Sequence, residues 1–126
     1  MKPVEQKYLH IPKIGQKGDC WRACLASILE CDIELFPDPN IITDWPTLYN
    51  DTLEVLDKMG YSYNSIPVSH FKGNGSYVVA IGKSPRSKRK RITHAVVWNN
   101  GIVFDPHPDH TGLLDITRFE VLITNQ

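Results

Sequence analysis

Residues 18–29 are the stretch that most restricts how this chain can fold. A glycine turn leads directly into a segment whose apolar side chains recur at the three- and four-residue spacing of a helix. The residues at this spacing are Trp21, Cys24, Leu25 and Ile28. We therefore expect a helix from about Cys20 to about Glu30, with a broad face buried in the protein.

Cys20 begins that helix, and this position favours a reactive thiol. Asp19 is a preferred N-cap residue, so we expect its side chain to accept a hydrogen bond from a backbone N–H of the first turn. The positive end of the helix dipole stabilises a thiolate, which is the nucleophilic form of cysteine. We interpret Cys20 as the nucleophile, Cys24 as a packing residue and Cys31 as structural or incidental. The alternative for Cys20 is a plain core position, because free cysteine is among the most buried residue types.

The residues before this helix are expected to be an extended lead-in, in which 6–11 are the one plausible short strand. A second helix is predicted to start at Pro46, where Asp44 or Trp45 leads into it, because proline suits a first helical position. Gly60 closes this helix as a C-terminal cap.

From Tyr61 onward the pattern changes from helical to extended. The later segments are rich in β-branched and aromatic residues, which favour strands. These segments are 61–68, 76–81, 92–98, 101–105 and 119–124. Two helices followed by sequential strands predict an α+β fold, in which the Cys20 helix packs on one face of an antiparallel sheet. The composition is 41% hydrophobic over 126 residues, so we expect residues 1–126 to form a single domain.

The sequence 99–101, Asn-Asn-Gly, predicts a hairpin between two of these strands, because Asn and Gly tolerate positive φ. A two-residue turn would pair His94 with His107 and make His94 a diagonal neighbour of Asp105. The alternative is a three-residue turn with a bulge, which changes this register. A cysteine, a histidine and an acid that orients the histidine together form the constellation that activates a thiol.

Six of the fourteen basic residues lie in one short segment without an acidic residue. They are Lys83, Arg86, Lys88, Arg89, Lys90 and Arg91. We interpret this segment as a solvated loop, and the alternative is an anion-binding arm. In that arm Lys88, Arg89, Lys90 and Arg91 would contact nucleic acid or an acidic substrate. Nucleic acid is the less favoured partner, because no aromatic residues interleave with the charges.

The three cysteines do not indicate a disulfide framework, since their number is odd and two of them lie one helical turn apart. The beginning of the chain lacks the apolar region of a secretory signal, and no apolar stretch has the length of a membrane span. We therefore predict a cytoplasmic protein with reduced cysteines and no membrane partner.

Two blocks of the chain carry a distinctive order of residues. They contain Asp19-Cys20-x-x-Ala23-Cys24-Leu25-Ala26 in the first block, and His94-Ala95-Val96-Val97 followed by Asp105-Pro106 in the second. This order resembles the papain-like cysteine peptidase superfamily, most closely its C39-like branch. The beginning and the Asp-Pro-His-Pro segment also resemble a small group of uncharacterised phage and prophage-associated proteins.

The resemblance implies a papain-like fold in which Cys20 is the nucleophile, His94 the base and Asp105 the residue that orients His94. Members of the superfamily usually place a glutamine six residues before the cysteine, where it stabilises the oxyanion. That position is Ile14 in this chain, and Gln16 is the nearest candidate. The backbone N–H of Cys20 could supply the other donor.

These observations predict a cysteine hydrolase that cleaves an amide, peptide or isopeptide bond in a peptide or protein substrate. No metal and no organic cofactor is implied. One alternative is an acyltransferase or transglutaminase-like enzyme with the same triad, and another is a non-catalytic binding module that uses the basic segment 83–91. A metal site is a further alternative, at His107 and His110 or with Cys20 and Cys24, which lie four residues apart, although no CxxC or HExxH spacing supports it.

Overall fold

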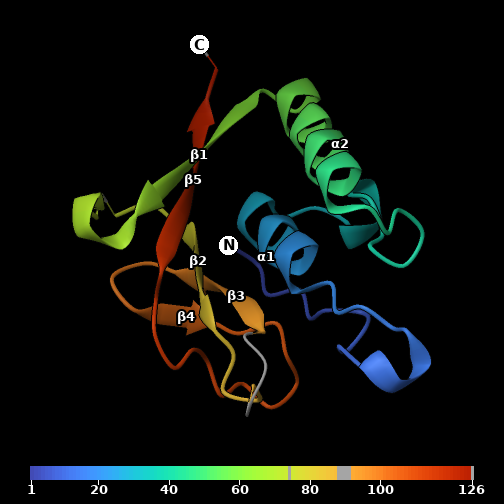
Figure 1. Ribbon diagram of the computed structural model, residues 1–126. Helices are drawn as coiled ribbons and strands as arrows, with labels where there is room; N and C mark the ends of the chain where they lie inside the picture. Colours follow the sequence, from blue (N-terminus) through green and yellow to red (C-terminus); the bar gives the residue numbers. More distant parts are fainter. Residues whose placement is uncertain (74, 88–91, 126) are drawn as a thin grey trace.

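The computed structural model describes residues 1–73, 75–87 and 92–125. In these residues two α-helices, α1 (Cys20–Leu29) and α2 (Trp45–Lys58), pack on one antiparallel sheet of five strands. The strands are β1 (Tyr61–Pro67), β2 (Val78–Lys83), β3 (Thr93–Trp98), β4 (Ile102–Phe104) and β5 (Arg118–Thr124). Their order in the sheet is β1-β5-β2-β3-β4. The predicted α+β fold, with an antiparallel sheet and the Cys20 helix on one face, is confirmed (Figure 1).

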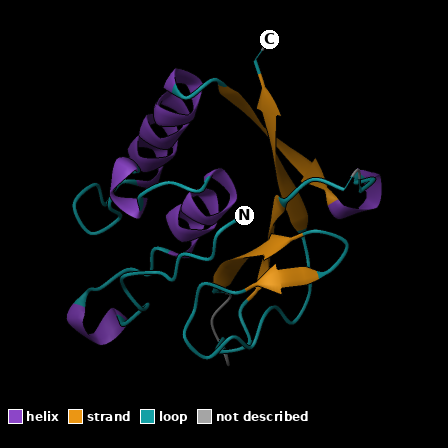
Figure 2. Cartoon of the chain, turned by 180° about the vertical axis from the view of Figure 1, so that it is seen from behind, coloured by secondary structure: helices purple, strands orange, loops and turns teal. Residues whose placement is uncertain are grey.

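Helix α1 occupies the centre of the structure, next to β2 and β3, and α2 packs against β1 (Figures 1 and 2). All residues from Arg22 to Ser27 are buried. The helix is therefore enclosed on several sides, and not only along the apolar face that the sequence predicts. Its side chains share a core with Val79 and Val97 of the sheet. The helix ends at Leu29 because Glu30 adopts a left-handed conformation, with φ of 55°.

The opposite face of the sheet is covered by the segments that connect the strands. Val78, Ala80, Val96 and Phe119 form a second core cluster there. Phe71 from the segment after β1, and Leu113 and Ile116 from the segment between β4 and β5, pack against this cluster. The long segment between β4 and β5, residues 105–117, is therefore held against the sheet, and Asp105 is its first residue.

Helix α2 begins as the sequence indicates. Asp44 is its N-cap, and its carboxylate accepts a hydrogen bond of 2.8 Å from the Thr47 N–H. The helix ends before Gly60, which adopts a φ of 93° that glycine tolerates without a steric penalty.

The structure corrects the predicted strand in the lead-in. Residues 6–11 form no strand, and the described part of this segment has only an isolated bridge between Ile11 and Gln16. The lead-in is instead fixed by contacts to distant residues, such as the bond of 3.0 Å from the Gln6 N–H to the Pro106 carbonyl.

The turn of the β3–β4 hairpin also differs from the two-residue prediction. Val97 pairs with Phe104 as expected, but Trp98 pairs with Ile102, so three residues form the turn and a bulge shifts the register. The ladder ends at Phe104, and His94 pairs with Gly82 of β2 instead of His107.

Gly82 lies where the 105–117 segment crosses β2. A Cβ atom at this position would lie 1.8 Å from the Asp115 carbonyl oxygen, which is backbone and cannot rotate away. Only glycine therefore allows this segment to approach the strand that pairs with His94.

We predict that Gly82→Ala destabilises the protein by roughly 3 kcal/mol, because the added methyl group must displace backbone. Gly73→Ala is the matched control, since its Cβ would meet only the side-chain oxygen of Asn100, at 2.9 Å. Urea unfolding followed by circular dichroism measures both. Equal stability of the two variants would contradict this account of Gly82.

Candidate active site

A pocket of about 230 Å³ opens at the N-terminal end of α1. Cys20 and His94 both line it, and side chains from α2, β2 and β5 contribute to its wall. Much of this wall is apolar and includes Trp21, Trp45 and Ile81. The predicted nucleophile and base therefore face a shared cavity that is large enough for one side chain or acyl group of a substrate.

Asp105 is bonded directly to His94. The distance from His94 Nε2 to Asp105 Oδ1 is 2.6 Å, and both side chains are buried. The Asp105 carboxylate also accepts backbone hydrogen bonds from His107, at 2.9 Å, and Gly112, at 2.8 Å. These contacts fix the carboxylate in a loop that follows β4, so it can hold the imidazole in one orientation.

The His94 ring also interacts with Cys20. Burial alone lowers the pKa of His94, but hydrogen bonds to Asp105 and Cys20 and the charges of both residues outweigh it and raise the pKa to about 9. Because Nε2 is bonded to Asp105, Nδ1 is the ring nitrogen available to the thiol. Burial raises the pKa of Asp105, and the bonds from His94, His107 and Gly112 more than offset it, so the pKa is lowered overall. The raised pKa favours the protonated form of the His94 ring at neutral pH.

The other two cysteines lack this environment. Cys24 is fully buried, and its burial raises the pKa well above the usual value. Burial, followed by the charge of Asp32, also raises the pKa of Cys31. All three thiols are free in the structure.

Asp19 is the N-cap residue of α1, and the helix starts at Cys20 as predicted. The predicted capping bond is wrong, because the Asp19 side chain accepts no hydrogen bond from a backbone N–H of the first turn. One carboxylate oxygen accepts from the Tyr8 N–H at 2.9 Å, and the other accepts from Arg22 Nε at 3.0 Å. Arg22 in turn donates to the Phe36 carbonyl at 3.2 Å. The pair connects the lead-in, the start of α1 and the loop after it, and thereby positions Cys20.

Sequence reasoning missed Arg22, although one signal was present. A charged residue within an otherwise apolar helix must find a partner when the helix is buried, because an unpaired buried charge is costly. Arg22 has an exposed fraction of only 3%, and Asp19 three residues earlier is the nearest acid.

A second missed group lies on the pocket wall. Trp21 Nε1 donates to the Tyr63 hydroxyl at 2.8 Å, and Tyr63 donates to Glu120, which is buried on β5. Arg118 Nε also donates to Glu120, at 3.3 Å. Burial, followed by the charge of Glu120, raises the pKa of Tyr63, so its hydroxyl stays protonated and donates.

Gln16, the predicted oxyanion donor, is not brought to the pocket. The side-chain amide of Gln16 donates to the Leu9 carbonyl at 2.8 Å, and Gln16 does not line the cavity. Lys88, Arg89, Lys90 and Arg91 lie outside the described residues. From the same basic segment, Arg86 is paired with Asp109 at 2.9 Å.

His107 and His110, which follow Asp105, each have a partner within the protein. His107 Nδ1 accepts from the Asp109 N–H at 3.1 Å, and His110 Nε2 lies 3.2 Å from a carboxylate oxygen of Glu5. The described ranges contain no group of three or more His, Cys, Asp or Glu residues that could hold a metal ion. Within the same ranges, neither helix is long and apolar enough to cross a membrane.

Comparison with known proteins gave no match to this chain among family models, curated proteins or solved structures.

We predict that Asp19→Ala destabilises the protein by roughly 3 kcal/mol, because it leaves the buried Arg22 with only its longer ion pairs to Glu34, at 3.9 Å, and Asp38, at 3.8 Å. Asp44→Ala is the control, since it removes a carboxylate that only caps an exposed helix start and should cost much less. Urea unfolding at neutral pH measures both variants. If the two variants lose the same stability, the role given to the pair of Asp19 with Arg22 is wrong.

Proposed function

We propose that the protein is a cysteine hydrolase of papain-like type, close to the C39-like branch, which cleaves an amide, peptide or isopeptide bond. The observation that carries this proposal is the bond from His94 Nε2 to Asp105, beside a cysteine at a helix start in the same pocket. In such an arrangement the carboxylate fixes the buried histidine, and the other ring nitrogen of the histidine can activate the thiol as a nucleophile.

In the proposed reaction the Cys20 sulfur attacks the carbonyl carbon of the scissile bond, and the carbonyl oxygen becomes an oxyanion. The imidazolium of His94 stabilises the thiolate before attack and then gives its proton to the leaving amine. A water molecule next attacks the thioester carbon and gives a proton to His94. The carbon–sulfur bond then breaks, which releases the carboxylic acid and returns Cys20 to its thiolate form. Asp105 holds the ring in place throughout and stabilises its positive charge.

The oxyanion donors we propose are backbone N–H groups at the beginning of α1. The first intrahelical hydrogen bond runs from the Ala23 N–H to the Asp19 carbonyl, at 3.2 Å. The N–H groups of Cys20 and Trp21 precede it, and the Asp19 side chain does not cap them. Such groups point toward negative charge at the end of a helix, and they suit an oxyanion better than Gln16 in its present position.

A non-catalytic binding module on the same fold is the second candidate. The observation that favours it is the Gln16 amide, which is bonded to Leu9 and does not reach the pocket. An acyltransferase would use the same three residues and differ only in the acceptor, an amine in place of water.

We predict that iodoacetamide labels Cys20 at least about tenfold faster than Cys24 or Cys31 at neutral pH, since thiolates are the reactive form. His94→Ala should slow labelling of Cys20 by about tenfold or more, whereas His110→Ala, which alters an exposed histidine paired with Glu5, should not. Mass spectrometry of the alkylated peptides assigns each rate. Faster labelling of Cys24 or Cys31, or a rate indifferent to His94, would refute the proposed nucleophile.

A peptide mixture then distinguishes the three activities, with Cys20→Ala as the blank. Release of a free carboxylic acid and an amine indicates hydrolysis. Incorporation of an added amine indicates acyl transfer, and no product from either acceptor leaves the binding module as the better account.

A further inference from the structure

The charged side chains that line the pocket are not equally available to a ligand. Asp19 and Arg22 neutralise each other, and both are buried. Lys17 extends to the Thr43 carbonyl at 2.5 Å. The remaining charged pair consists of Glu120 and Arg118 on β5, which face the same cavity as Cys20.

Glu120 is already satisfied within the protein. One of its carboxylate oxygens accepts from the Tyr63 hydroxyl, and the other accepts from Arg118 Nε at 3.3 Å. Its side chain is 5% exposed. Glu120 therefore holds Arg118 in place and is itself poorly placed to receive a cationic group of a substrate.

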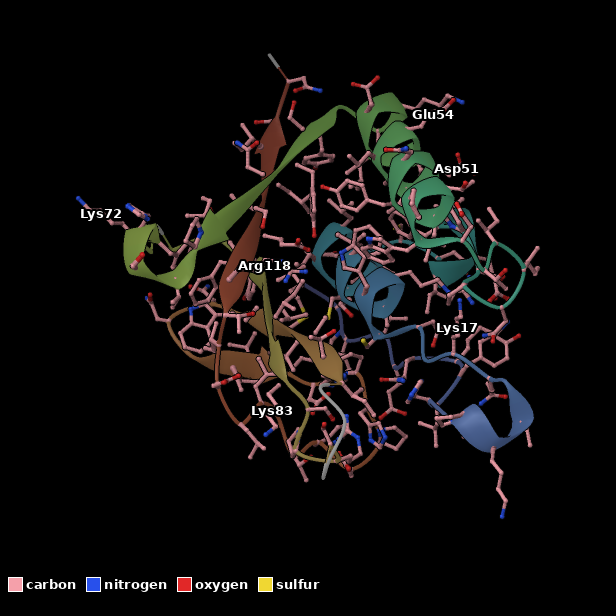
Figure 3. All side chains as sticks on the ribbon, viewed as in Figure 1. Lys17, Asp51, Glu54, Lys72, Lys83 and Arg118 are labelled. Carbon is pink, nitrogen blue, oxygen red and sulfur yellow. The ribbon has the colours of Figure 1, made fainter. Side chains whose placement is uncertain are left out.

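Arg118 is in the opposite situation. Its side chain is 40% exposed and it lines the pocket. Among the described residues, Nε is the guanidinium nitrogen that donates a hydrogen bond, so both terminal nitrogens are left to donate to a ligand. Figure 3 shows Arg118 between β5 and α1, on the side of the sheet that carries the pocket.

The position of Arg118 on the sheet relates it to the proposed catalytic residues. Arg118 pairs with Ile81 of β2, and Ile81 pairs with Ala95, which follows His94 on β3. Arg118, Ile81, Ala95 and Cys20 all line the one cavity. A group bound at Arg118 therefore shares this small space with the acyl group that Cys20 would accept.

We propose that Arg118 determines substrate specificity by binding a carboxylate of the substrate, and that Glu120 positions its guanidinium for this purpose. A guanidinium offers two parallel N–H donors that match a carboxylate, and the largely apolar wall strengthens such a bond. The inference rests on the proposed function, since it concerns the substrate of Cys20. The carboxylate belongs either to an acidic side chain or to a free chain terminus.

Thiol reagents of opposite charge test this at Cys20. The carboxyethyl and aminoethyl methanethiosulfonates form a mixed disulfide with a thiol, release methanesulfinate and differ mainly in charge. We expect the ratio of their rates, carboxyethyl over aminoethyl, to fall about tenfold or more in Arg118→Gln, on the scale of a hydrogen bond to a charged group. Lys72→Gln removes the same charge on the far side of the molecule (Figure 3) and should change the ratio less than about twofold.

The ratio separates this proposal from the proposed function, because the intrinsic reactivity of Cys20 cancels in it. If Cys20 reacts slowly with both reagents but Arg118→Gln still lowers the ratio about tenfold, the result supports the role of Arg118 and contradicts the proposed hydrolase function. A ratio that is unchanged in Arg118→Gln, or that falls equally in Lys72→Gln, overturns the proposal. So does a preference of the wild type for the aminoethyl reagent.

Equilibrium binding in a Cys20→Ala background identifies the source of the carboxylate and needs no reactive thiol. Trp21 and Trp45 line the pocket, so their fluorescence reports occupancy. N-acetylglutamate amide carries only a side-chain carboxylate, N-acetylglutamine only a terminal one, and N-acetylglutamine amide neither. We expect one of the two acids to bind at least about tenfold more tightly than the neutral amide, and this preference to vanish in Arg118→Gln.

Equal binding of all three compounds overturns the proposal. If Arg118→Gln does not fold, Arg118→Gln combined with Glu120→Gln replaces it, because the double variant leaves no buried charge unpaired while Tyr63 can still donate to the amide. Persistence of the anion preference in that double variant would equally refute the role of Arg118.

Discussion

The Asp105 carboxylate is the contact on which the candidate site depends. It receives hydrogen bonds from the His94 ring and from the backbone of His107 and Gly112, all between 2.6 and 2.9 Å. The carboxylate thereby joins β3 to the segment between β4 and β5, and that segment passes Gly82 of β2 so closely that only glycine fits there. Sheet and loop together fix the imidazole, and α1 brings Cys20 to it from the other side.

Two charge pairs lie around the pocket, the fully buried pair of Asp19 with Arg22 and the pair of the buried Glu120 with the partly exposed Arg118. Such pairs add little net stability, because the cost of desolvation cancels much of the attraction, but losing one partner is expensive. We infer that the role of these pairs is to position the groups around the pocket. The first fixes the start of the helix that carries Cys20, and the second holds a guanidinium at the pocket wall.

The sequence was sufficient for features that local patterns determine and insufficient for those set by distant contacts. Helix α1 begins at Cys20, and the strands lie within about two residues of their predicted bounds, because periodicity of side chains is a local property. The contact of His94 with Asp105 followed from a hairpin signal, although the turn has a bulge. Asp19 was assigned to the wrong partner, since Tyr8 and Arg22 reach it only in the folded chain. The contact between Glu120 and Tyr63, 57 residues apart, could not be predicted from the sequence. The one indication was a charged residue, Glu120, within an otherwise apolar strand.

The protonation state of His94 is the most direct measure of the central claim, which is that Cys20, His94 and Asp105 act as one unit. Nitrogen NMR of the labelled imidazole reports its charge and its titration midpoint. We predict an imidazolium at pH 7 with a midpoint near 9, because the folded-state pKa lies above the usual 6.5, and a clearly lower midpoint in Asp105→Asn. A neutral His94 ring at pH 7, or a midpoint that Asp105→Asn does not change, would contradict the account.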